Sequence, residues 1–393
     1  MRAERTPKAV WAAVGAQFGL AFSMNYLTVF LPFYIRSVSE LPEAQTLVWT
    51  GLILAASPAA ASIASPMWGS LTSRISPKLL FLRGMLTHAV MITVTAFTTS
   101  LPLLLGLRVV QGAMGGISTI ALIIIGAVSR KEQLAGHIGL FNSAMTTGSI
   151  LAPPIGSVVA ASLGFEAGFL SAAAIVTLAF AFGLRFLPAI PPVPPRADAP
   201  PVSRRALFAA WLVSVMAMTQ LVFLAAILPD VLAGFGMTGR KAVVAAGLVV
   251  AAYGATAALG SASLRWLHGL AHRRAVLQAG LASAILQGAL ALAPNLAVFV
   301  VLRVVQTFLA GLIVPLIMAD VAATGRGGAV GTLNTARFAG LALAPLVATS
   351  LLARTNLATV YLALAAATLV SLVVFMVSGP DEGSRRTERR VAA

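Results

Sequence analysis

Two five-residue stretches of this chain place the same polar side chains inside long apolar segments. Residues 107–111 read Leu-Arg-Val-Val-Gln, and residues 302–306 repeat that sequence. A charged side chain at membrane depth costs roughly 2.5–3.5 kcal/mol on insertion scales, so it normally faces protein or water and marks a functional position. Arg108 and Gln111 share a helix face, as do Arg303 and Gln306, because residues three apart are neighbours on a helix. Each arginine can hold carbonyls of its own half, contact a substrate or take part in proton movement.

The composition indicates that lipid is the solvent. Hydrophobic residues make up 59% of the 393 residues, charged residues 10%, and the mean hydropathy is +0.94, whereas soluble domains carry about 25% charged residues. The net charge of +16 could suggest nucleic acid, but the basic residues form short clusters between apolar spans, as the positive-inside rule predicts. We therefore expect no nucleic-acid partner. The chain has no cysteine, which excludes disulfides and thiolate metal sites, and we expect no metal and no cofactor.

Twelve segments have the roughly 20 mostly apolar residues that a span needs. They are 10–34, 47–68, 79–98, 101–127, 134–162, 167–187, 206–232, 242–264, 274–292, 296–319, 328–353 and 358–377. The basic start resembles a signal peptide, but its apolar run reaches about Ile35, too far for one, and predicts the first span. With the N-terminus inside, outer loops hold only Arg36, Arg240, Lys241 and Arg354 of the 27 Lys and Arg. This bias predicts a multi-pass protein of the cell inner (plasma) membrane with both termini cytoplasmic.

The sequence also contains an internal duplication. A proline-rich tether, residues 188–205, separates residues 1–187 from residues 206–377, and a basic tail, 378–393, follows. Leu31-Pro32 in span one matches Leu228-Pro229 in span seven. In span five, Gly139, Asn142, Gly148, Ala152 and Pro153 have the spacing of Gly331, Asn334, Gly340, Ala344 and Pro345 in span eleven. We predict an all-α polytopic membrane protein with twelve transmembrane helices in two pseudo-symmetric six-helix bundles.

At these positions the chain resembles the major facilitator superfamily over its whole length, and most of all its twelve-span drug-exporter (drug:H+ antiporter-1-like) branch. Span four matches the motif Arg-x-x-Gln-Gly at Arg108, Gln111 and Gly112. Span five matches the antiporter motif at Gly139, Gly148, Ala152, Pro153, Gly156 and Ser157, where Ala152 and Ser157 replace glycines. The loop after span two keeps Gly69, Arg74 and Lys78 of its motif, while Ser73, Ser76 and Pro77 depart from it.

The resemblance implies the major facilitator fold, in which spans one, four, seven and ten line a central cavity and two bundles rock about it. It also implies that the span-five motif forms a close contact between the halves, although a stripe of Gly148, Ala152 and Gly156 is equally suited to ordinary helix packing. The three departures in the loop lie where the family latches its inner face. We expect that latch to be weaker here or rebuilt from other groups.

Other polar side chains in the spans are candidates for substrate contact or coupling. Arg337 lies about nine residues into span eleven, and its counterpart in the first half is Met145, so the duplication does not explain it. Asn334 and its twin Asn142 are better suited to packing hydrogen bonds. Span one offers Asn25 and Tyr26, and span seven offers Gln220, groups that suit an adaptable and largely apolar pocket.

None of the eleven acidic residues is deep in a predicted span, and the nearest are Asp230 and Asp320. Proton-coupled exporters of cations generally keep a buried carboxylate, often in span one, where this chain has Asn25. Three buried arginines without a buried acid predict a cavity that favours an anionic or neutral, partly apolar compound. The membrane potential, worth about 2.3 kcal/mol per charge per 100 mV, can then contribute to export. Protons remain a candidate coupling ion, with Asp230, Asp320 or His137 to carry them.

These features leave three functions to compare. The first is an alternating-access exporter of small amphipathic compounds or drugs, and the second is an importer of an organic anion or other metabolite on the same fold. The third is a membrane enzyme, which needs paired acids or clustered histidines near a membrane surface. Only His268 and His272 are close in sequence, and no acid is near them. We therefore predict a monomeric transporter of a small molecule and not an enzyme.

Overall fold

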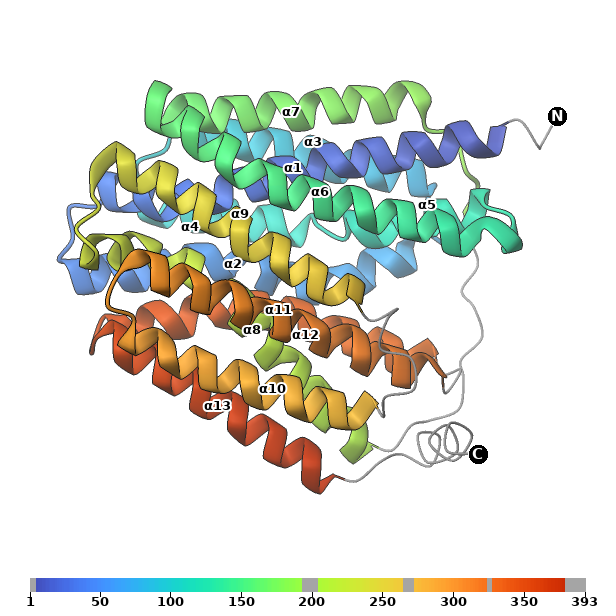
Figure 1. The fold of residues 1–393 in the computed structure, drawn as a ribbon. Coiled ribbons are helices and arrows are strands. Elements are labelled where there is room, and N and C mark those ends of the chain that lie inside the picture. Colours follow the sequence, from blue (N-terminus) through green and yellow to red (C-terminus); the bar gives the residue numbers. More distant parts are fainter. Residues whose placement is uncertain (1–4, 193–203, 264–271, 324–326, 379–393) are drawn as a thin grey trace. The chain divides into compact units, whose positions relative to one another are not determined.

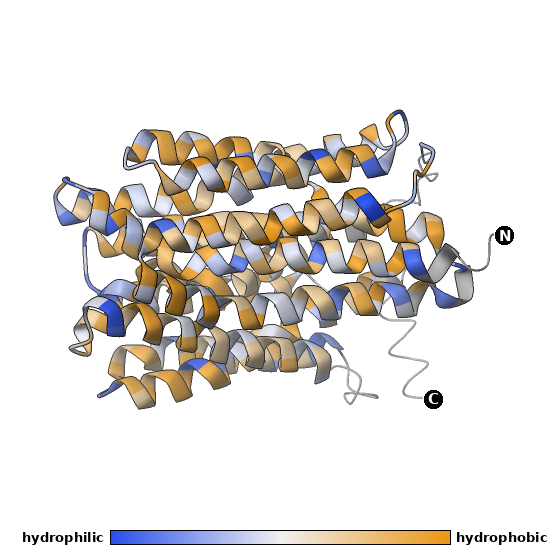
Figure 2. Ribbon diagram, turned by 90° about the horizontal axis from the view of Figure 1, so that it is seen from above, coloured by the Kyte–Doolittle hydropathy of each residue, from blue (hydrophilic) through white to orange (hydrophobic). Residues whose placement is uncertain are grey.

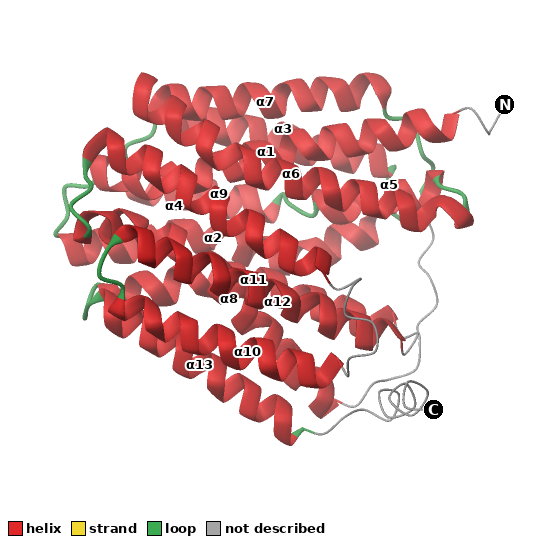
Figure 3. Cartoon of the chain, viewed as in Figure 1, coloured by secondary structure: helices red, strands yellow, loops and turns green. Residues whose placement is uncertain are grey.

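The computed structural model describes residues 5–192, 204–263, 272–323 and 327–378. Within these ranges the chain is helical almost throughout and contains no strand (Figures 1 and 3). Most of the predicted tether, the basic tail and His268 lie outside the described residues. The structure therefore bears on the apolar segments and on the short connections between them.

The apolar segments predicted from the sequence are long helices. The first half contains α1 (Arg5–Val38), α2 (Glu43–Leu71), α3 (Pro77–Ala96), α4 (Leu101–Ala113), α5 (Ile117–Val128), α6 (Lys131–Leu163) and α7 (Phe165–Phe186). The second half contains α8 (Arg204–Gly234), α9 (Gly239–Ser263), α10 (His272–Ala289) with the 3₁₀ turn η2 (Leu290–Leu292), α11 (Leu296–Ala323), α12 (Gly327–Leu352) and α13 (Leu357–Val377). Among the described residues, 12 candidate membrane spans result, because α4 and α5 together form span four. The prediction of a twelve-span, all-α membrane protein is confirmed.

Helices dominate because lipid offers no hydrogen bonds to the backbone, so each span must satisfy its own N–H and C=O groups. Figure 2 shows apolar colours along most of each helix and the strongest polar colours in loops and near helix ends. Several spans contain proline, for example Pro32 in α1 and Pro345 in α12. Proline removes one backbone donor, and neighbouring helices and Ser or Thr side chains compensate for that loss inside a membrane.

The duplication is visible in the way the helices pack. In the first half α1 packs on α6 and α7, and α3 packs on α7 and α5. In the second half the equivalent helix α8 packs on α12 and α13, and α10 packs on α13 and α11. Each half thus repeats one set of helix neighbours, as a repeated sequence requires.

The chain divides into two compact units, and each unit includes one segment from the other half of the chain. Unit 1 consists of residues 1–40, 56–196 and 237–251, and unit 2 consists of residues 41–55, 197–236 and 252–393. The start of α2 therefore belongs to unit 2, and the start of α9 belongs to unit 1. A division at the tether alone, between residues 187 and 206, remains a prediction from the sequence.

The two exchanged segments make equivalent contacts. In unit 2, Gly51 of α2 lies against the hydroxyl of Thr349, which donates to the carbonyl of Pro345 (2.8 Å). In unit 1, Gly247 of α9 lies against the hydroxyl of Ser157 in α6. Neither position has room for a larger side chain, so glycine allows each pair of helices to approach closely.

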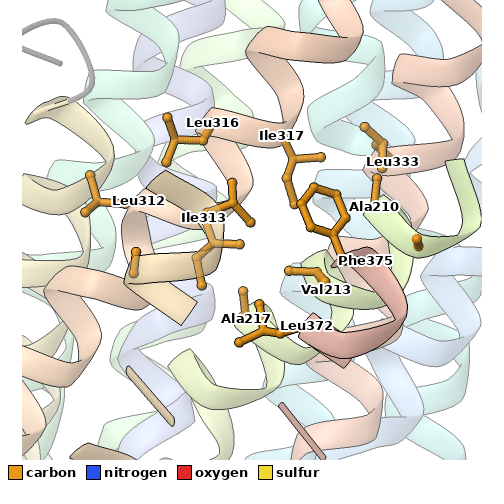
Figure 4. Close-up of a cluster of buried hydrophobic side chains, with 13 residues drawn as sticks. Ala210, Val213, Ala217, Leu312, Ile313, Leu316, Ile317, Leu333, Leu372 and Phe375 are labelled. Atoms are coloured by element: carbon orange, nitrogen blue, oxygen red, sulfur yellow. The ribbon is translucent and has the colours of Figure 1, made fainter. Parts of the chain in front are cut away.

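Each unit has its own packed interior. Figure 4 shows an apolar cluster of unit 2 to which α8, α10, α11, α12 and α13 all contribute, with Val213, Ile313 and Phe375 among its members. In unit 1, aromatic rings join α1 to α7. The ring centroids of Tyr34 and Phe169 are 4.9 Å apart.

The small-residue stripe of α6 packs against α1 within unit 1. A Cβ atom on Gly148 would lie 3.2 Å from the backbone nitrogen of Phe22, and one on Gly156 would lie 2.5 Å from the carbonyl oxygen of Tyr26. Ala152, between them, is fully buried. The other face of α6 carries Ser157, which meets Gly247 as described above. The motif therefore supports two helix contacts, both inside unit 1.

This packing distinguishes two glycines of the same motif. We expect Gly156→Ala to lower the free energy of unfolding by about 1–3 kcal/mol, because the added methyl group forces α1 and α6 apart. Gly139→Ala is the matched control, since nothing lies within 4 Å of a Cβ atom there. That change should leave stability unchanged or raise it by about 0.5–1 kcal/mol, because alanine is the better helix former. Thermal unfolding of both purified variants in detergent measures the difference, and equal melting temperatures would contradict the packing described here.

Candidate functional site

Span four is broken close to its arginine motif. Helix α4 ends at Ala113 and α5 begins at Ile117, with Gly116 at a φ of 79° between them. This left-handed conformation favours glycine, because a side chain would clash with the backbone. The equivalent span of the second half, α11, runs unbroken through the same region. The two copies of the motif therefore stand in different backbone settings.

Two side chains satisfy carbonyls that the break releases. Trp68 of α2 donates from Nε1 to the carbonyl of Ala113 (2.7 Å), and Arg83 of α3 donates from Nη2 to the carbonyl of Met114 (3.0 Å). The Arg83 guanidinium also lies 3.4 Å from the centroid of the Trp68 ring, a stacking that stabilises the cation. Arg83 and Trp68 thus hold the end of α4 in place, a role that the sequence pattern did not reveal.

Arg108 lies on the face of α4 that points into unit 1. The buried residues of this helix include Leu104, Leu107 and Gln111, whereas Val109 and Val110 are exposed on the other side. Arg108 donates from Nη1 to Oε1 of Gln111 (2.8 Å). Its side chain keeps 8% of its surface accessible.

Gln111 and His88 flank Arg108. The amide nitrogen of Gln111 contacts the thioether sulfur of Met24 on α1 (3.6 Å), which is a weak acceptor. His88 of α3 is buried, holds the carbonyl of Gly84 through Nδ1 (3.0 Å), and lies within electrostatic reach of Arg108 and Arg83. The sequence analysis missed His88 because a lone histidine in an apolar span has no periodic signal.

Arg303 of α11 is fully enclosed in unit 2, with 0% of its surface accessible. It donates from Nη1 to Oε1 of Gln306 (2.6 Å) and from Nη2 to the carbonyl of Leu221 (2.9 Å). The rings of Tyr253 and Phe223 lie 4.7 Å and 4.9 Å from its guanidinium carbon. The second arginine of the repeat therefore has acceptors and aromatic neighbours that the first lacks.

Gln306 continues this arrangement into a buried polar network. Its amide donates to Oε1 of Gln220 (2.6 Å) and to the hydroxyl of Ser283 (3.1 Å). Gln220 in turn donates to the hydroxyl of Thr368 (2.5 Å). The network connects α8, α10, α11 and α13, and every one of these side chains is almost completely buried. Gln220, proposed from the sequence as a substrate contact, lies at its centre.

The span-one candidates are bonded inside unit 1. Asn25 donates to the carbonyl of Ala21, one turn earlier in its own helix (2.8 Å). The hydroxyl of Tyr26 pairs with that of Ser171 on α7 (3.0 Å), and the Tyr26 ring is buried beside Gly156. Asn25 is only partly buried, so it keeps surface that a ligand can reach.

Arg337 is exposed on α12 of unit 2. Its neighbour Ala336 is fully buried, and Leu333 one turn earlier belongs to the apolar cluster. The side chain of Asn334 lies outside the described residues. Arg337 is thus a cation with accessible surface near the start of the candidate span Thr335–Leu352.

The loop after span two is tied to the end of span six. Lys78 donates from Nζ to the carbonyls of Leu187 (2.5 Å) and Leu184 (3.1 Å), at the C-terminal end of α7, and Ser76 donates to the carbonyl of Ile190 (2.9 Å). A cation at this end of a helix also opposes the helix dipole favourably. Arg74 is exposed and Gly69 is only partly buried. Two of the motif positions thus hold the loop against its own unit.

A duplicated set of twelve spans with buried arginines is the architecture typical of secondary transporters. The sequence profile of the Major Facilitator Superfamily matches residues 13–286, and the chain belongs to this superfamily. With its twelve candidate spans in the described residues, it is a multi-pass membrane protein of this superfamily.

Individual relatives resemble parts of the chain. The staphyloferrin B transporter of Staphylococcus aureus (strain NCTC 8325 / PS 47) is 32% identical over 168 residues, which is 43% of this chain and 40% of that protein. The multidrug resistance protein MdtG of Enterobacter lignolyticus (strain SCF1) is 28% identical over 169 residues, 43% of this chain and 40% of that protein. The chain thus spans about two fifths of the length of these curated relatives.

Among solved structures, that of the human organic anion transporter MFSD10 (TETRAN) superposes with a TM-score of 0.70. The match covers 94% of this chain and 99% of that chain at 17% sequence identity. This likeness concerns the fold.

The two motif glutamines should differ in their effect on stability. Gln306→Leu removes one buried hydrogen-bond partner from each of Gln220, Ser283 and Arg303, so we expect a loss of about 1–3 kcal/mol or more. Gln111→Leu is the matched change in the other half. It should cost clearly less, because it breaks one hydrogen bond, from Arg108, and a contact with a weak acceptor, whereas Gln306→Leu also breaks bonds to Gln220 and Ser283. Thermal unfolding of the two purified variants gives the comparison. A larger loss for Gln111→Leu would contradict the contrast between the two networks.

Proposed function

We propose that the protein is an alternating-access exporter of small amphipathic compounds, anionic or neutral, across the cell inner membrane. The names of the relatives support transport of small compounds, since one is a staphyloferrin B transporter and another a multidrug resistance protein. The small-residue motif of span five, which this chain shares with exporters of the family, supports export as the direction. Both termini are proposed to be cytoplasmic, and the protein is proposed to act as a monomer.

One observation carries the proposal for anionic or neutral substrates. Among the described residues, Arg108 and Arg303 donate hydrogen bonds to neutral groups, namely amide oxygens and a backbone carbonyl. A guanidinium keeps its charge in a protein, so Arg108 gives the interior of unit 1 a positive potential. In unit 2 the charge of Arg303 is partly offset by the Asp230 carboxylate, because both interact with Tyr361. An anion gains from that potential, and a cation is repelled by it.

Transport then follows from a change between two states. Substrate binds where the units leave their polar interior accessible, and it shifts the equilibrium only by its difference in affinity between the states. In unit 1, Arg108, Gln111 and Asn25 are the proposed contacts, because each keeps surface or hydrogen-bonding capacity. In unit 2, exposed Arg337 is a separate candidate. Arg303, Gln306, Gln220 and Tyr26 are proposed to hold their own units together.

Import of an organic anion or another metabolite is the alternative, because the same arginines would serve it. Accumulation of a labelled anion in intact cells, with and without the gene, separates the two directions. Export lowers the cellular level when the gene is present, and import raises it.

Transport in liposomes tests the substrate class. Purified protein should move the anionic dye carboxyfluorescein when a voltage pulls anions through it, with little movement of the cationic dye ethidium. The voltage and the pH gradient are imposed separately, and protein-free liposomes are the control. Movement of ethidium on a pH gradient alone would refute the preference for anions, and Asp230 would then be the first residue to examine.

Reporter fusions test the proposed orientation. Alkaline phosphatase is active only outside the cytoplasm, so a fusion after Glu40, between α1 and α2, should be active. A fusion after Ser378, which follows α13, should be inactive. The reverse pattern would place the termini outside and contradict the orientation predicted from the distribution of Lys and Arg.

A further inference from the structure

We infer that the two copies of the Arg-x-x-Gln motif have diverged in role. Arg108, together with Gln111, contacts the negative charge of the substrate, and Arg303 is a positioning residue that holds unit 2 together. The inference rests on the proposed transport of anions and assigns their recognition to one half of the duplicated chain.

Arg303 has no surface to offer a ligand. Its two Nη atoms are bound to Gln306 and to the Leu221 carbonyl, and 0% of the side chain is accessible. Tyr253 and Phe223 lie against its guanidinium. Its Nε has no acceptor among the described residues but is completely buried. An anion could reach this guanidinium only if the packed helices of unit 2 separated.

Arg108 differs in each of these respects. Its hydrogen-bond partner in the described part of the chain is Gln111, through Nη1 alone. The side chain keeps 8% of its surface accessible, and its Nε and Nη2 atoms are not among the completely buried polar atoms without a partner. The Nε and Nη2 atoms of the guanidinium therefore remain to donate to a ligand.

The sequence explains why one copy is open and the other closed. Gly51 and Gly247 make equivalent contacts, and this correspondence places Ser57 of α2 where α9 has Tyr253. The first half thus has a small hydroxyl in place of the ring that covers Arg303. Alignment of Leu31-Pro32 with Leu228-Pro229 makes Tyr26 the counterpart of Phe223 in the repeat. The Tyr26 hydroxyl forms its hydrogen bond with Ser171.

The free groups around Arg108 define the chemistry of the ligand. A guanidinium binds a carboxylate through two parallel N–H donors. The Gln111 amide, which now contacts only the Met24 sulfur, can add a third donor. Met24 supplies a polarizable apolar surface beside the charge. The site therefore suits the carboxylate of a partly apolar compound.

The absence of cysteine from the natural chain allows a direct test. Arg108→Cys and Arg303→Cys each introduce one thiol, and water-soluble methanethiosulfonate reagents report whether it is reached in folded protein. We expect rapid labelling at position 108. At position 303 we expect labelling only after denaturation.

Binding of carboxyfluorescein, followed by fluorescence anisotropy at one pH, provides the second readout. Arg108→Cys should weaken binding about 10- to 100-fold, as expected for a lost hydrogen bond to a charged group. Aminoethylation of the new thiol returns a positive charge and should restore most of the affinity, whereas ethylation should not. Arg303→Cys should lower the melting temperature, and Arg303→Lys keeps the charge and serves as the folded variant, with affinity within about twofold of the natural protein.

The outcomes separate this inference from the proposed function. If the natural protein binds and transports carboxyfluorescein but Arg108→Cys binds it equally well, or aminoethylation restores nothing, the division of roles is wrong while anion transport stands. A large loss of affinity in folded Arg303→Lys also overturns the division. If the natural protein neither binds nor moves the anion, the proposed function itself fails.

Discussion

The structure depends on how a permanently charged guanidinium is accommodated within apolar spans. Arginine does not lose its proton in a protein, so each copy needs acceptors, aromatic faces or water. Arg303 is supplied by a glutamine, a backbone carbonyl and two rings inside unit 2. Arg83 is supplied by the Met114 carbonyl and the ring of Trp68. Arg108 receives much less from its own unit, and this shortfall is what makes it a candidate for substrate binding.

Backbone hydrogen bonding imposes the second constraint. A span that stops being helical in lipid exposes carbonyls that no water can satisfy, so breaks occur only where protein groups replace the lost bonds. The break between α4 and α5 follows this rule, because Trp68 and Arg83 bind the carbonyls of Ala113 and Met114. Because Arg83 of α3 binds the Met114 carbonyl, the backbone at the end of α4 depends on a side chain of α3. The position of Arg108 thus depends on side chains from two other helices.

Close helix contacts give each unit its rigidity. Gly156 lets α6 approach α1, Gly247 lets α9 approach α6, and Gly51 lets α2 approach α12. Such packed contacts tolerate only discrete rearrangements, because interiors have almost no free volume. A conformational change of this chain should therefore move packed bodies in which buried networks such as that of Gln220, Gln306 and Ser283 stay intact.

The sequence alone determined the number of spans and the repeat. Long apolar runs require helices in lipid, and the recurring motifs required equivalent helix neighbours, which α1 and α8 display. It also singled out Arg108 and Arg303, because charge in an apolar segment is conspicuous. Only the tertiary structure decided that these twins differ. Their difference comes from groups on other helices, namely the Tyr253 and Phe223 rings and the Leu221 carbonyl around Arg303, whose proximity no local pattern encodes. The break after Ala113 and the burial of His88 and Tyr26 were likewise decided by packing, since spacing along one helix specifies a face but not what covers it.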